Sequence, residues 1–348
     1  MKPLIYVFFS LFFCGLFAQE IPRSYIAHKT SEPIIIDGKP TEEAWKAASW
    51  TQDFVDIEGI KTPKYRTNVK MLWDEENLYF YAKIEEPDIW ATLKQRDTVI
   101  FYNNDFEIFI DPDGDTENYM EFEINALNTV WDLLLLKTYR EGGHAVDSWD
   151  IKSLKSEVNI KGSLNDSSDK DEFWSVEIAM PWAVLTETSP SNEIPVNDFW
   201  RINFSRVNWD FQLKDGKYSR KFDENKNYLP EYNWVWSPQG VINMHEPEHW
   251  GYVYFSDKKP GEKEVFTIPN DEKIKWFLYD LYRKQRSYFE KHHEWVTQIS
   301  DLVKGEIIID NEKISPRLES HVIGWNISVN SPFTGKMLTI KEDGDFVE

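Results

Sequence analysis

The sequence is nearly free of cysteine. Its single cysteine, Cys14, falls within an apolar N-terminal stretch, residues 4–17. This stretch follows Lys2 and is bounded by Ala18, a pattern that predicts a secretory signal peptide over residues 1–18 with cleavage near Ala18. The remaining chain has no cysteine, so it can form neither a disulfide nor a thiol nucleophile. We expect a secreted or periplasmic protein.

Positive charge is also scarce. The chain has 39 basic and 60 acidic residues, a formal net charge of -21. Nucleic acids and anionic lipid surfaces attract proteins through basic patches, so this charge balance argues against both as binding partners. After the signal, no segment is apolar enough over a sufficient length to span a bilayer. We therefore expect no membrane insertion once the signal is removed.

Recognisable catalytic motifs are missing as well. The run HEPEH, residues 245–249, matches the zinc-protease pattern letter for letter, but Pro247 disrupts the helix on which that pattern depends. Acidic residues are plentiful enough that glycoside hydrolysis stays open, although no spacing singles out an acid and a base. We therefore name no catalytic residue and favour a protein that is not an enzyme.

The residues that are present favour a mainly β fold. Short runs of alternating apolar and polar residues fill the chain from residue 34 to residue 255, separated by turn clusters such as DEEN and DPDGD. This pattern predicts a β-sandwich of the immunoglobulin-like or jelly-roll type over residues 19–256. The run TEEAWKAAS, residues 41–49, predicts one short helix inside it.

The C-terminal third has a different pattern. A charged segment with two prolines leads into apolar residues at helical spacing, which predicts a linker and one long helix over residues 257–303, with the helix at 271–302. Residues 304–348 return to strand-like runs and predict a small β tail. An apolar helix stripe of this length needs cover. We expect it to pack on the sandwich, on a second copy of the chain or on another partner.

Alternation along the strands separates the core face from the outward face. In residues 105–111, Phe106, Ile108 and Ile110 point to the core while Glu107 points away. The same rule on other strands gives an outward face with the polar residues Glu107, Glu123, Asn125, Glu177, Arg201 and Asn203. Such a face is either solvated or able to hydrogen-bond the hydroxyl groups of a ligand.

Several motifs occur in the order typical of one known family. IIIDGKPTEEAW, NDFEIFIDPDGD, MEFEIN, FWSVEIAMPW and WVWSP follow one another between about residues 34 and 255. In this region the chain resembles family 9 carbohydrate-binding modules. The resemblance implies a β-sandwich that binds sugars of the xylan or glucan type between two aromatic rings and commonly carries calcium.

The resemblance also suggests which residues contact the sugar. Phe101 and Tyr102 match the position of one aromatic ring, and Glu107 matches a sugar-binding glutamate. Glu123 falls near a family arginine, which reverses the charge there. The second aromatic ring of the family matches Trp236, with Trp234 two residues before it. With the polar residues of the outward face added, the predicted carbohydrate-binding set is Phe101, Tyr102, Glu107, Glu123, Asn125, Arg201, Trp234 and Trp236.

An acidic run, DPDGDTEN, follows the first of these strands. Asp111, Asp113 and Asp115 occupy alternate positions. Clustered carboxylates suit calcium, which takes six to eight oxygen ligands. Asp-Pro and Asp-Gly are also turn formers, so a plain hairpin turn is the alternative, and the two are compatible. We name these three aspartates as the candidate calcium ligands.

Three functions are compatible with the sequence. The first is a secreted protein that binds poly- or oligosaccharide in support of polysaccharide catabolism. The second is a hydrolase that acts on glycosidic bonds at the same sheet face. The third is an interaction module that has lost sugar binding and docks a partner through its C-terminal helix.

Overall fold

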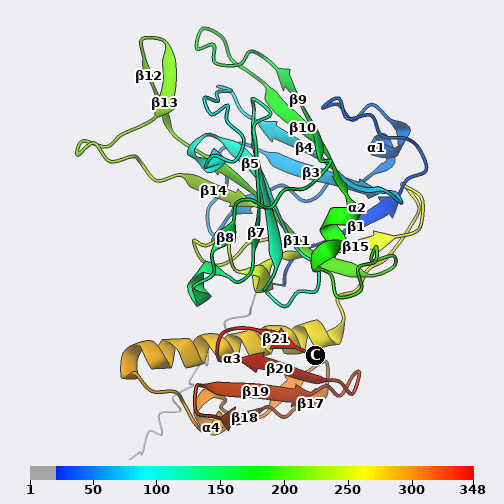
Figure 1. The fold of residues 1–348 in the computed structure, drawn as a ribbon, viewed down its shortest axis with the longest axis vertical. Helices are drawn as coiled ribbons and strands as arrows, with labels where there is room; N and C mark the ends of the chain where they lie inside the picture. Colours follow the sequence, from blue (N-terminus) through cyan, green and yellow to red (C-terminus); the bar gives the residue numbers. More distant parts are fainter. Residues whose placement is uncertain (1–20) are drawn as a thin grey trace, which may run out of the picture.

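The computed structural model describes residues 21–348, so the predicted signal peptide lies outside the described residues. The chain folds into a large β-sandwich and a smaller C-terminal unit of helix and strands (Figure 1). The predicted mainly β class is confirmed. Within the described residues, no helix combines the length and the apolar character needed to cross a bilayer.

The sandwich is built from a strongly curled sheet with thirteen strands among the described residues. Its path is β8-β7-β6-β5-β11-β15-β1-β3-β4-β10-β9, and β14 joins β11 to β2. The bounds are β1 (Ser24–Lys29), β2 (Val55–Asp56), β3 (Thr67–Trp73), β4 (Asn77–Glu85), β5 (Asp105–Asp111), β6 (Tyr119–Asn125), β7 (Val130–Leu135), β8 (Ala145–Val146), β9 (Lys155–Lys161), β10 (Phe173–Pro181), β11 (Phe199–Asn208), β14 (Tyr232–Val235) and β15 (Gly251–Ser256).

Short helices and one hairpin decorate this sheet. The predicted early helix is confirmed as α1 (Glu43–Ala47), and α2 (Trp182–Leu185) follows β10. The hairpin of β12 (Phe211–Lys214) and β13 (Lys217–Arg220) extends away from the sandwich (Figure 1). The 3-10 turns are η1 (Ile100–Tyr102), η2 (Tyr139–Glu141), η3 (Thr186–Thr188) and η4 (Pro247–His249).

The core lies between the two halves of the curled sheet. Phe80 of β4 meets Phe204 of β11 with ring centroids 5.8 Å apart, which places the halves face to face. Phe106 of β5 stacks on the same ring. All residues that alternation assigned to the core of β5 belong to this cluster and are buried. The inward and outward faces of β5 were therefore predicted correctly.

The long helix is shorter than predicted. α3 spans Asn270–His292 and ends where His293 adopts a left-handed conformation, φ 57°. The chain then folds back, and the side-chain amide of Gln285 exchanges two hydrogen bonds with the backbone of Val296. A separate turn, α4 (Ile299–Leu302), follows. One helix over 271–302 was thus a wrong prediction, because a positive-φ residue other than glycine ends it.

The C-terminal strands share a core with α3. β18 (Arg317–Ser320), β19 (Trp325–Asn330), β20 (Met337–Lys341) and β21 (Phe346–Val347) form one antiparallel sheet, and β16 (Ile307–Ile309) pairs with β17 (Glu312–Ile314). Leu278 and Leu281 of the helix pack into the same cluster as Trp325 and Ile340 of the sheet. The helix stripe is therefore covered from within the chain.

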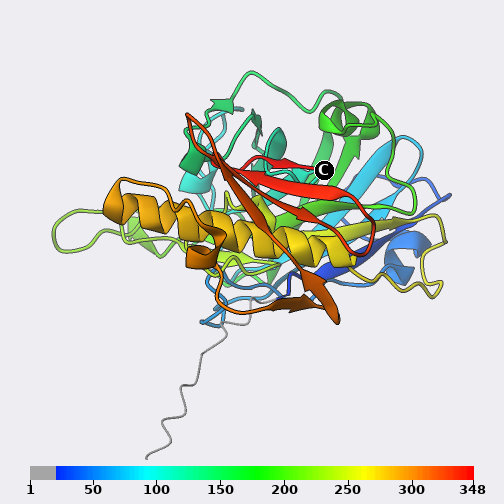
Figure 2. The same cartoon turned by 90° about the horizontal axis from the view of Figure 1, so that it is seen from below.

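The helix also contacts the sandwich through polar groups. Seen from below, α3 and the small sheet cross in front of the sandwich (Figure 2). Glu272 accepts a hydrogen bond from the Tyr252 hydroxyl at 2.8 Å, and Arg283 pairs with Glu248 at 2.5 Å. Arg140 pairs with the same carboxylate at 2.7 Å. Buried charges on both sides thus fix the two units together.

Candidate functional site

The candidate site is a cavity of about 410 Å³ on the outward face of β5, β6 and β7. The turns η1 and η2, strand β14 and the loop before η4 complete its wall. Its lining is Ile57, Phe101, Glu107, Phe109, Glu121, Glu123, Trp131, Tyr139, Val207, Glu231, Asn233, Ile242, Asn243, Met244 and His245.

Strand register brings the acidic residues of the cavity together. Antiparallel pairing sets Glu107 of β5 directly opposite Glu123 of β6. On the other side of β6, Trp131 of β7 lies opposite the same glutamate. Side chains of directly opposed residues share a face of the sheet. The predicted outward positions of Glu107 and Glu123 are therefore what the structure shows.

The carboxylates in and beneath this cavity are almost inaccessible to solvent. Asp105, Glu107, Glu121 and Glu123 are all buried. Backbone donors reach only some of their oxygens: Phe101 donates to Glu123 at 3.0 Å and Val207 donates to Asp105 at 3.0 Å. Within the described chain, neither lysine nor arginine lines this cavity.

Burial raises the pKa of these carboxyl groups. The pKa of Glu107 rises to about 7, mainly because its charged form loses solvation. The pKa values of Asp105, Glu121 and Glu123 rise well above their ordinary range, first through burial and then through repulsion from Glu107. The cavity therefore favours a ligand that donates hydrogen bonds or carries positive charge.

Aromatic rings form the apolar part of the cavity wall. Phe101 and Trp131 are partly exposed and Tyr139 is exposed. The Tyr139 ring meets the imidazole of His245 edge to face, with centroids 4.5 Å apart. His245 is hydrogen-bonded to Tyr119 at 2.9 Å, and burial lowers its pKa to about 4, so the imidazole is neutral.

The second predicted aromatic contact is wrong. Trp236 is 0% exposed and packs against Phe204 in the sandwich core. Trp234 is also buried, with the guanidinium of Arg206 lying 5.0 Å from its ring centroid. Neither ring presents a face to a ligand. Both residues lie on or beside β14, and their side chains turn toward the core of the sandwich rather than its outer surface.

Two predicted polar contacts serve the fold instead. The Asn125 side chain accepts hydrogen bonds from the N–H groups of Leu127 and Thr129, closing the β6–β7 turn. Arg201 donates to the Trp250 carbonyl and pairs with Glu272 of α3 at 3.5 Å. Both side chains are buried and their donors or acceptors are occupied, so neither belongs to the cavity.

Two further outward residues also lie elsewhere. Glu177 is on β10, in the other half of the sheet, and accepts hydrogen bonds from Gly38 and the Trp45 indole. The Asn203 side chain exchanges two hydrogen bonds with the backbone of Ser237.

Tyr102 is exposed beside the cavity and stacks with the Arg220 guanidinium at 4.4 Å. Of the predicted sugar contacts, Phe101, Glu107 and Glu123 line the cavity.

Sequence reasoning missed several lining residues. Glu121 was given no role, although it lies two residues before Glu123 and alternation therefore puts it on the same outward face. Trp131 follows the same rule, since it lies opposite Glu123 on the next strand, so pairing of consecutive strands could have found it. Asn243 and His245 come from an irregular loop whose position no periodicity predicts. Tyr139 belongs to η2 and carries no signal either.

The acidic turn after β5 is held by its own backbone. The carboxylate of Asp111 accepts hydrogen bonds from the N–H groups of Gly114 at 2.9 Å and Thr116 at 3.1 Å. Gly114 has φ +68°, a conformation that suits glycine, and an added Cβ would lie 3.1 Å from Arg201. The hairpin reading of this run is therefore what the backbone shows.

The same turn lies against α3. Lys275 donates to the Gly114 carbonyl at 3.4 Å, and the Tyr279 hydroxyl donates to the Asp115 carbonyl at 3.2 Å. Carboxylate oxygens of Asp111, Asp113 and Asp115 lie within 4.8 Å of one another. Burial and mutual repulsion raise the pKa of Asp115 to about 7. Three carboxylate oxygens this close together fit a hard cation.

The histidines of the HEPEH run do not form a zinc site. His245 faces the cavity, whereas His249 lies beside Arg283 at 3.1 Å. The glutamates of the run, Glu246 and Glu248, pair with Arg283. The run forms η4 rather than a full α-helical turn, so the two histidines do not share a helix face.

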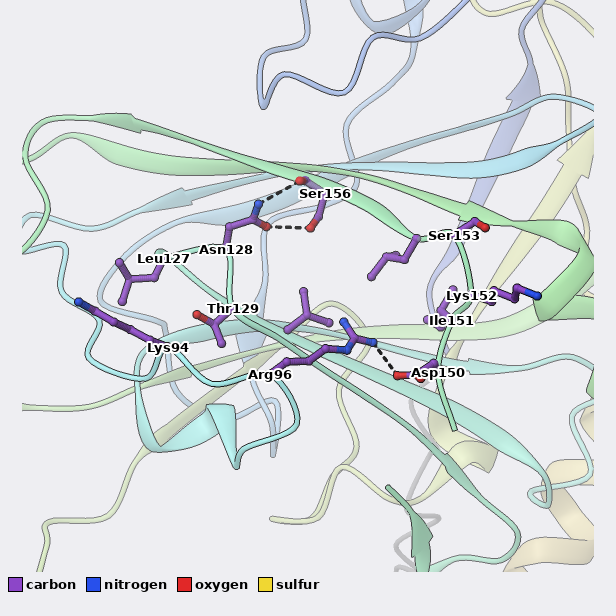
Figure 3. A pocket seen from close by; sticks show the side chains of 12 residues that line it. Lys94, Arg96, Leu127, Asn128, Thr129, Asp150, Ile151, Lys152, Ser153 and Ser156 are labelled. Atoms are coloured by element: carbon purple, nitrogen blue, oxygen red, sulfur yellow. Dashed lines mark hydrogen bonds and ion pairs between the residues drawn. The ribbon is translucent and has the colours of Figure 1, made fainter. Parts of the chain in front are cut away.

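A second hollow of about 690 Å³ lies at the β6–β7 turn (Figure 3). Arg96 donates to Asp150 at 2.9 Å and also bonds Asp132. Asn128 and Ser156 exchange two hydrogen bonds, at 3.0 and 2.7 Å. Because these polar groups already have partners, the larger hollow has fewer hydrogen-bonding groups available to a ligand than the cavity beside β5.

Comparison with known proteins supports the family resemblance. The family model described as carbohydrate family 9 binding domain-like matches residues 36–198. No curated protein matches the chain. Among solved structures, a proposed carbohydrate-binding protein from Bacteroides uniformis is similar with a TM-score of 0.50 and 15% identity, covering 68% of this chain and 100% of that chain. At this identity, the similarity shows the fold.

Two structures of a family 9 carbohydrate-binding module from Caldicellulosiruptor kristjanssonii are also similar. One is a complex with cellotriose, at a TM-score of 0.43 and 15% identity, covering 71% of this chain and all of that chain. The other is a complex with glucose, at 0.43 and 14%, covering 70% and 100%. At these scores the two structures carry no argument, and the family finding is the match of residues 36–198 to the carbohydrate family 9 binding domain-like model.

Proposed function

We propose that the chain binds carbohydrate in the cavity on the outward face of β5, β6 and β7. One observation carries this proposal: within a family 9 region, buried glutamates line a cavity whose wall includes partly exposed aromatic rings. Its volume, about 410 Å³, falls within the usual range of small-molecule sites, about 300–1,000 Å³.

The chemistry of the cavity suits a sugar. Sugar hydroxyls donate hydrogen bonds, and the oxygens of Glu107, Glu121 and Glu123 accept them. Apolar C–H faces of a pyranose pack on rings such as Phe101 and Trp131. The indole Nε1 of Trp131 is buried and has no hydrogen-bond partner in the described structure. Trp131 takes the role that the sequence assigned to Trp236.

We further propose the ligand class and setting that the family resemblance implies. The ligand is an oligosaccharide of the xylan or glucan type, and the protein is exported to capture it for polysaccharide catabolism. The predicted signal peptide and the negative net charge support export and a ligand without phosphate groups. Hydrolysis of a reporter glycoside by the purified protein would instead support the glycosidase alternative.

We also propose that the acidic turn binds calcium. Asp111, Asp113 and Asp115 would hold the ion, and their charge repulsion would then become favourable coordination. A cation there would fix the turn on which α3 rests. The test is thermal unfolding with calcium and with chelator; equal melting temperatures would contradict the proposal.

Calorimetry with xylo- and cello-oligosaccharides tests carbohydrate binding. Trp131→Ala should weaken binding by about 2 kcal/mol or more, as aromatic anchors in binding sites commonly do. Trp50→Ala is the matched control, because Trp50 is 39% exposed and lies outside the cavity. Equal affinity of both variants and the wild type would reject this cavity, and no binding by the wild type would reject the ligand class.

A further inference from the structure

Three carboxylates converge at the end of β5 that lies beneath the cavity. Oxygens of Asp105, Glu107 and Glu123 lie within 4.8 Å of one another. Calcium binds oxygens at 2.3–2.6 Å, so ligands on opposite sides of one ion are about 4.6–5.2 Å apart. The three oxygens therefore fit within a single calcium coordination sphere. Proximity alone does not make a site, since carboxylates also cluster where the fold satisfies them.

The fold leaves one of these oxygens unsatisfied. Asp105 is 0% exposed, and its Oδ1 accepts the N–H of Val207 at 3.0 Å. Its Oδ2 is buried without a hydrogen-bond partner among the described residues. A buried carboxylate oxygen without a donor is costly, and folded proteins rarely keep one without a reason. This oxygen belongs to the residue that joins Glu107 and Glu123 in the cluster.

Among the described residues, Arg206 is a basic side chain that acts on this cluster. The cavity wall described by the structure adds Glu121 and Glu231 but neither lysine nor arginine. Burial and the neighbouring carboxylates raise the pKa of Asp105 and outweigh the charge of Arg206, which lowers it. The guanidinium pairs with Glu86 at 3.7 Å and donates to Thr67 at 3.1 Å, while its Nε has no hydrogen-bond partner in the described structure. One shared cation does not balance three carboxylates, so the remaining charge is compensated by a bound species or by protons.

We propose that Asp105, Glu107 and Glu123 bind a divalent cation of calcium size at the closed end of the cavity. This inference rests on the proposed carbohydrate site, which it deepens. Three protein oxygens leave several of the six to eight calcium positions open. Glu107 and Glu123 also line the cavity, so these positions face the bound sugar, and ligand hydroxyls complete the coordination. Sugar binding then depends on the cation.

A single ammonium group explains the site less well. An amino sugar would need one or two carboxylates and could reach them from the cavity. Asp105 is outside the cavity lining and fully buried, where a small ion reaches it and a sugar substituent does not. We therefore favour the metal, and binding of glucosamine oligomers serves as the competing outcome.

The first test measures calcium by calorimetry on metal-free protein. Asp105→Asn keeps the side-chain shape but removes the charge, and it should lower calcium affinity at this site by at least the effect of losing an outer-shell partner, about 10- to 100-fold. Asp257→Asn is the matched control, because Asp257 is exposed and belongs to none of the carboxylate clusters. Equal calcium titrations of Asp105→Asn and the wild type would overturn the proposal.

The second test needs no variant. Wild-type protein is titrated with cello- and xylo-oligosaccharides in calcium and again in EDTA, with circular dichroism confirming that the fold persists. Binding should be lost in EDTA. Equal sugar affinity in both buffers would overturn the metal and leave the sugar site standing. Calcium binding at Asp105 without any sugar binding would reject the proposed function and leave the metal site standing.

The competing ligand is tested under the same conditions. Glucosamine oligomers that bind in EDTA and are displaced by calcium would assign the cluster to an ammonium group and overturn the metal. Failure of glucosamine oligomers to bind in EDTA, with calcium-dependent binding of neutral oligosaccharides, is the expected result.

Discussion

The two ends of strand β5 both carry clustered carboxylates, but the backbone treats them differently. At its C-terminal end, Asp111 accepts hydrogen bonds from Gly114 and Thr116, which form the turn. At its N-terminal end, Asp105 accepts one hydrogen bond and keeps one oxygen unpartnered. The difference shows that acidic composition alone does not identify a binding site. Unsatisfied acceptors beside a cavity do.

The comparison between the two ends of β5 assumes that the ligand binds on the outward face of the sheet. A substitution of Trp236, which lies in the core, is the strongest test of this assumption. Trp236→Ala should lower the free energy of unfolding by about 3–5 kcal/mol, as the loss of a large buried ring does. The variant protein that remains folded should bind sugar with wild-type affinity, because the Trp236 ring lies in the core and does not contact the ligand. Urea unfolding and calorimetry measure the two effects. Normal stability with lost binding would move the site to the core side.

The turn end of β5 should matter for stability. Asp111→Ala would leave the N–H groups of Gly114 and Thr116 without their acceptor beneath α3. Each unsatisfied buried group costs about 1–3 kcal/mol, so we expect a loss of about 2–5 kcal/mol in EDTA. Asp113→Asn, at an exposed position, is the control and should stay within about 0.5 kcal/mol of the wild type. Equal effects of both would contradict the structural role.

The contact between the units should weaken in acid. Charge from Arg140 and Arg283 overcomes burial and holds the pKa of Glu248 at about 2, below the ordinary 4.5. Because the folded-state pKa is depressed, the contribution of Glu248 is complete above about pH 4.5 and disappears as the pH falls toward 2. It amounts to at most about 3.5 kcal/mol, given about 1.4 kcal/mol for each pKa unit.

Urea unfolding of Glu248→Gln at several pH values isolates this contribution. The variant should be less stable than the wild type at pH 6, and the gap should narrow steadily between pH 4.5 and pH 2. A gap that stays constant through this range would mean that the Arg140 and Arg283 pairs do not stabilise the charged form.

The smallest effect is expected at the cavity end of β5. In EDTA, Asp105→Asn should raise the free energy of unfolding by about 1 kcal/mol, the usual net worth of one hydrogen bond. The new amide group can donate a hydrogen bond to a neighbouring carboxylate, whereas the ionised carboxylate of Asp105 has no donor. With calcium present the sign should reverse, since the wild type gains from the ion. If Asp105→Asn in EDTA lowered the free energy of unfolding as much as Asp111→Ala does, the two ends of β5 would not differ in the way proposed.

The sequence was informative where strand pairing follows chain order. Alternation in β5 and β6 placed Glu107 and Glu123 on the outward face, and consecutive pairing brought them opposite each other. The role of Trp236 came from the family resemblance instead, and it was wrong because a buried tryptophan has the same local sequence pattern as one that lines a cavity. Residue 236 follows β14, which pairs with β11 and β2, two strands far apart in sequence.

The C-terminal unit shows a second limit. Apolar spacing continues past His292, so the sequence predicts a longer helix, and neither glycine nor proline stands at the break. The helix ends at the left-handed His293, and the chain folds back so that Val296 exchanges two hydrogen bonds with the Gln285 side chain. Competition between local propensity and tertiary contact is not readable from one sequence.

Strand β1 has a consequence for how the sandwich is made. It is the central strand that pairs, in parallel, with β15 on one side and β3 on the other. Ser24 is aligned with Tyr252, so the first described strand must wait for almost the whole sandwich to leave the ribosome before its ladder closes. Pairings so distant in sequence close slowly. During synthesis, the edge of β1 that pairs with β15 stays open to wrong partners until residues 251–256 have been made.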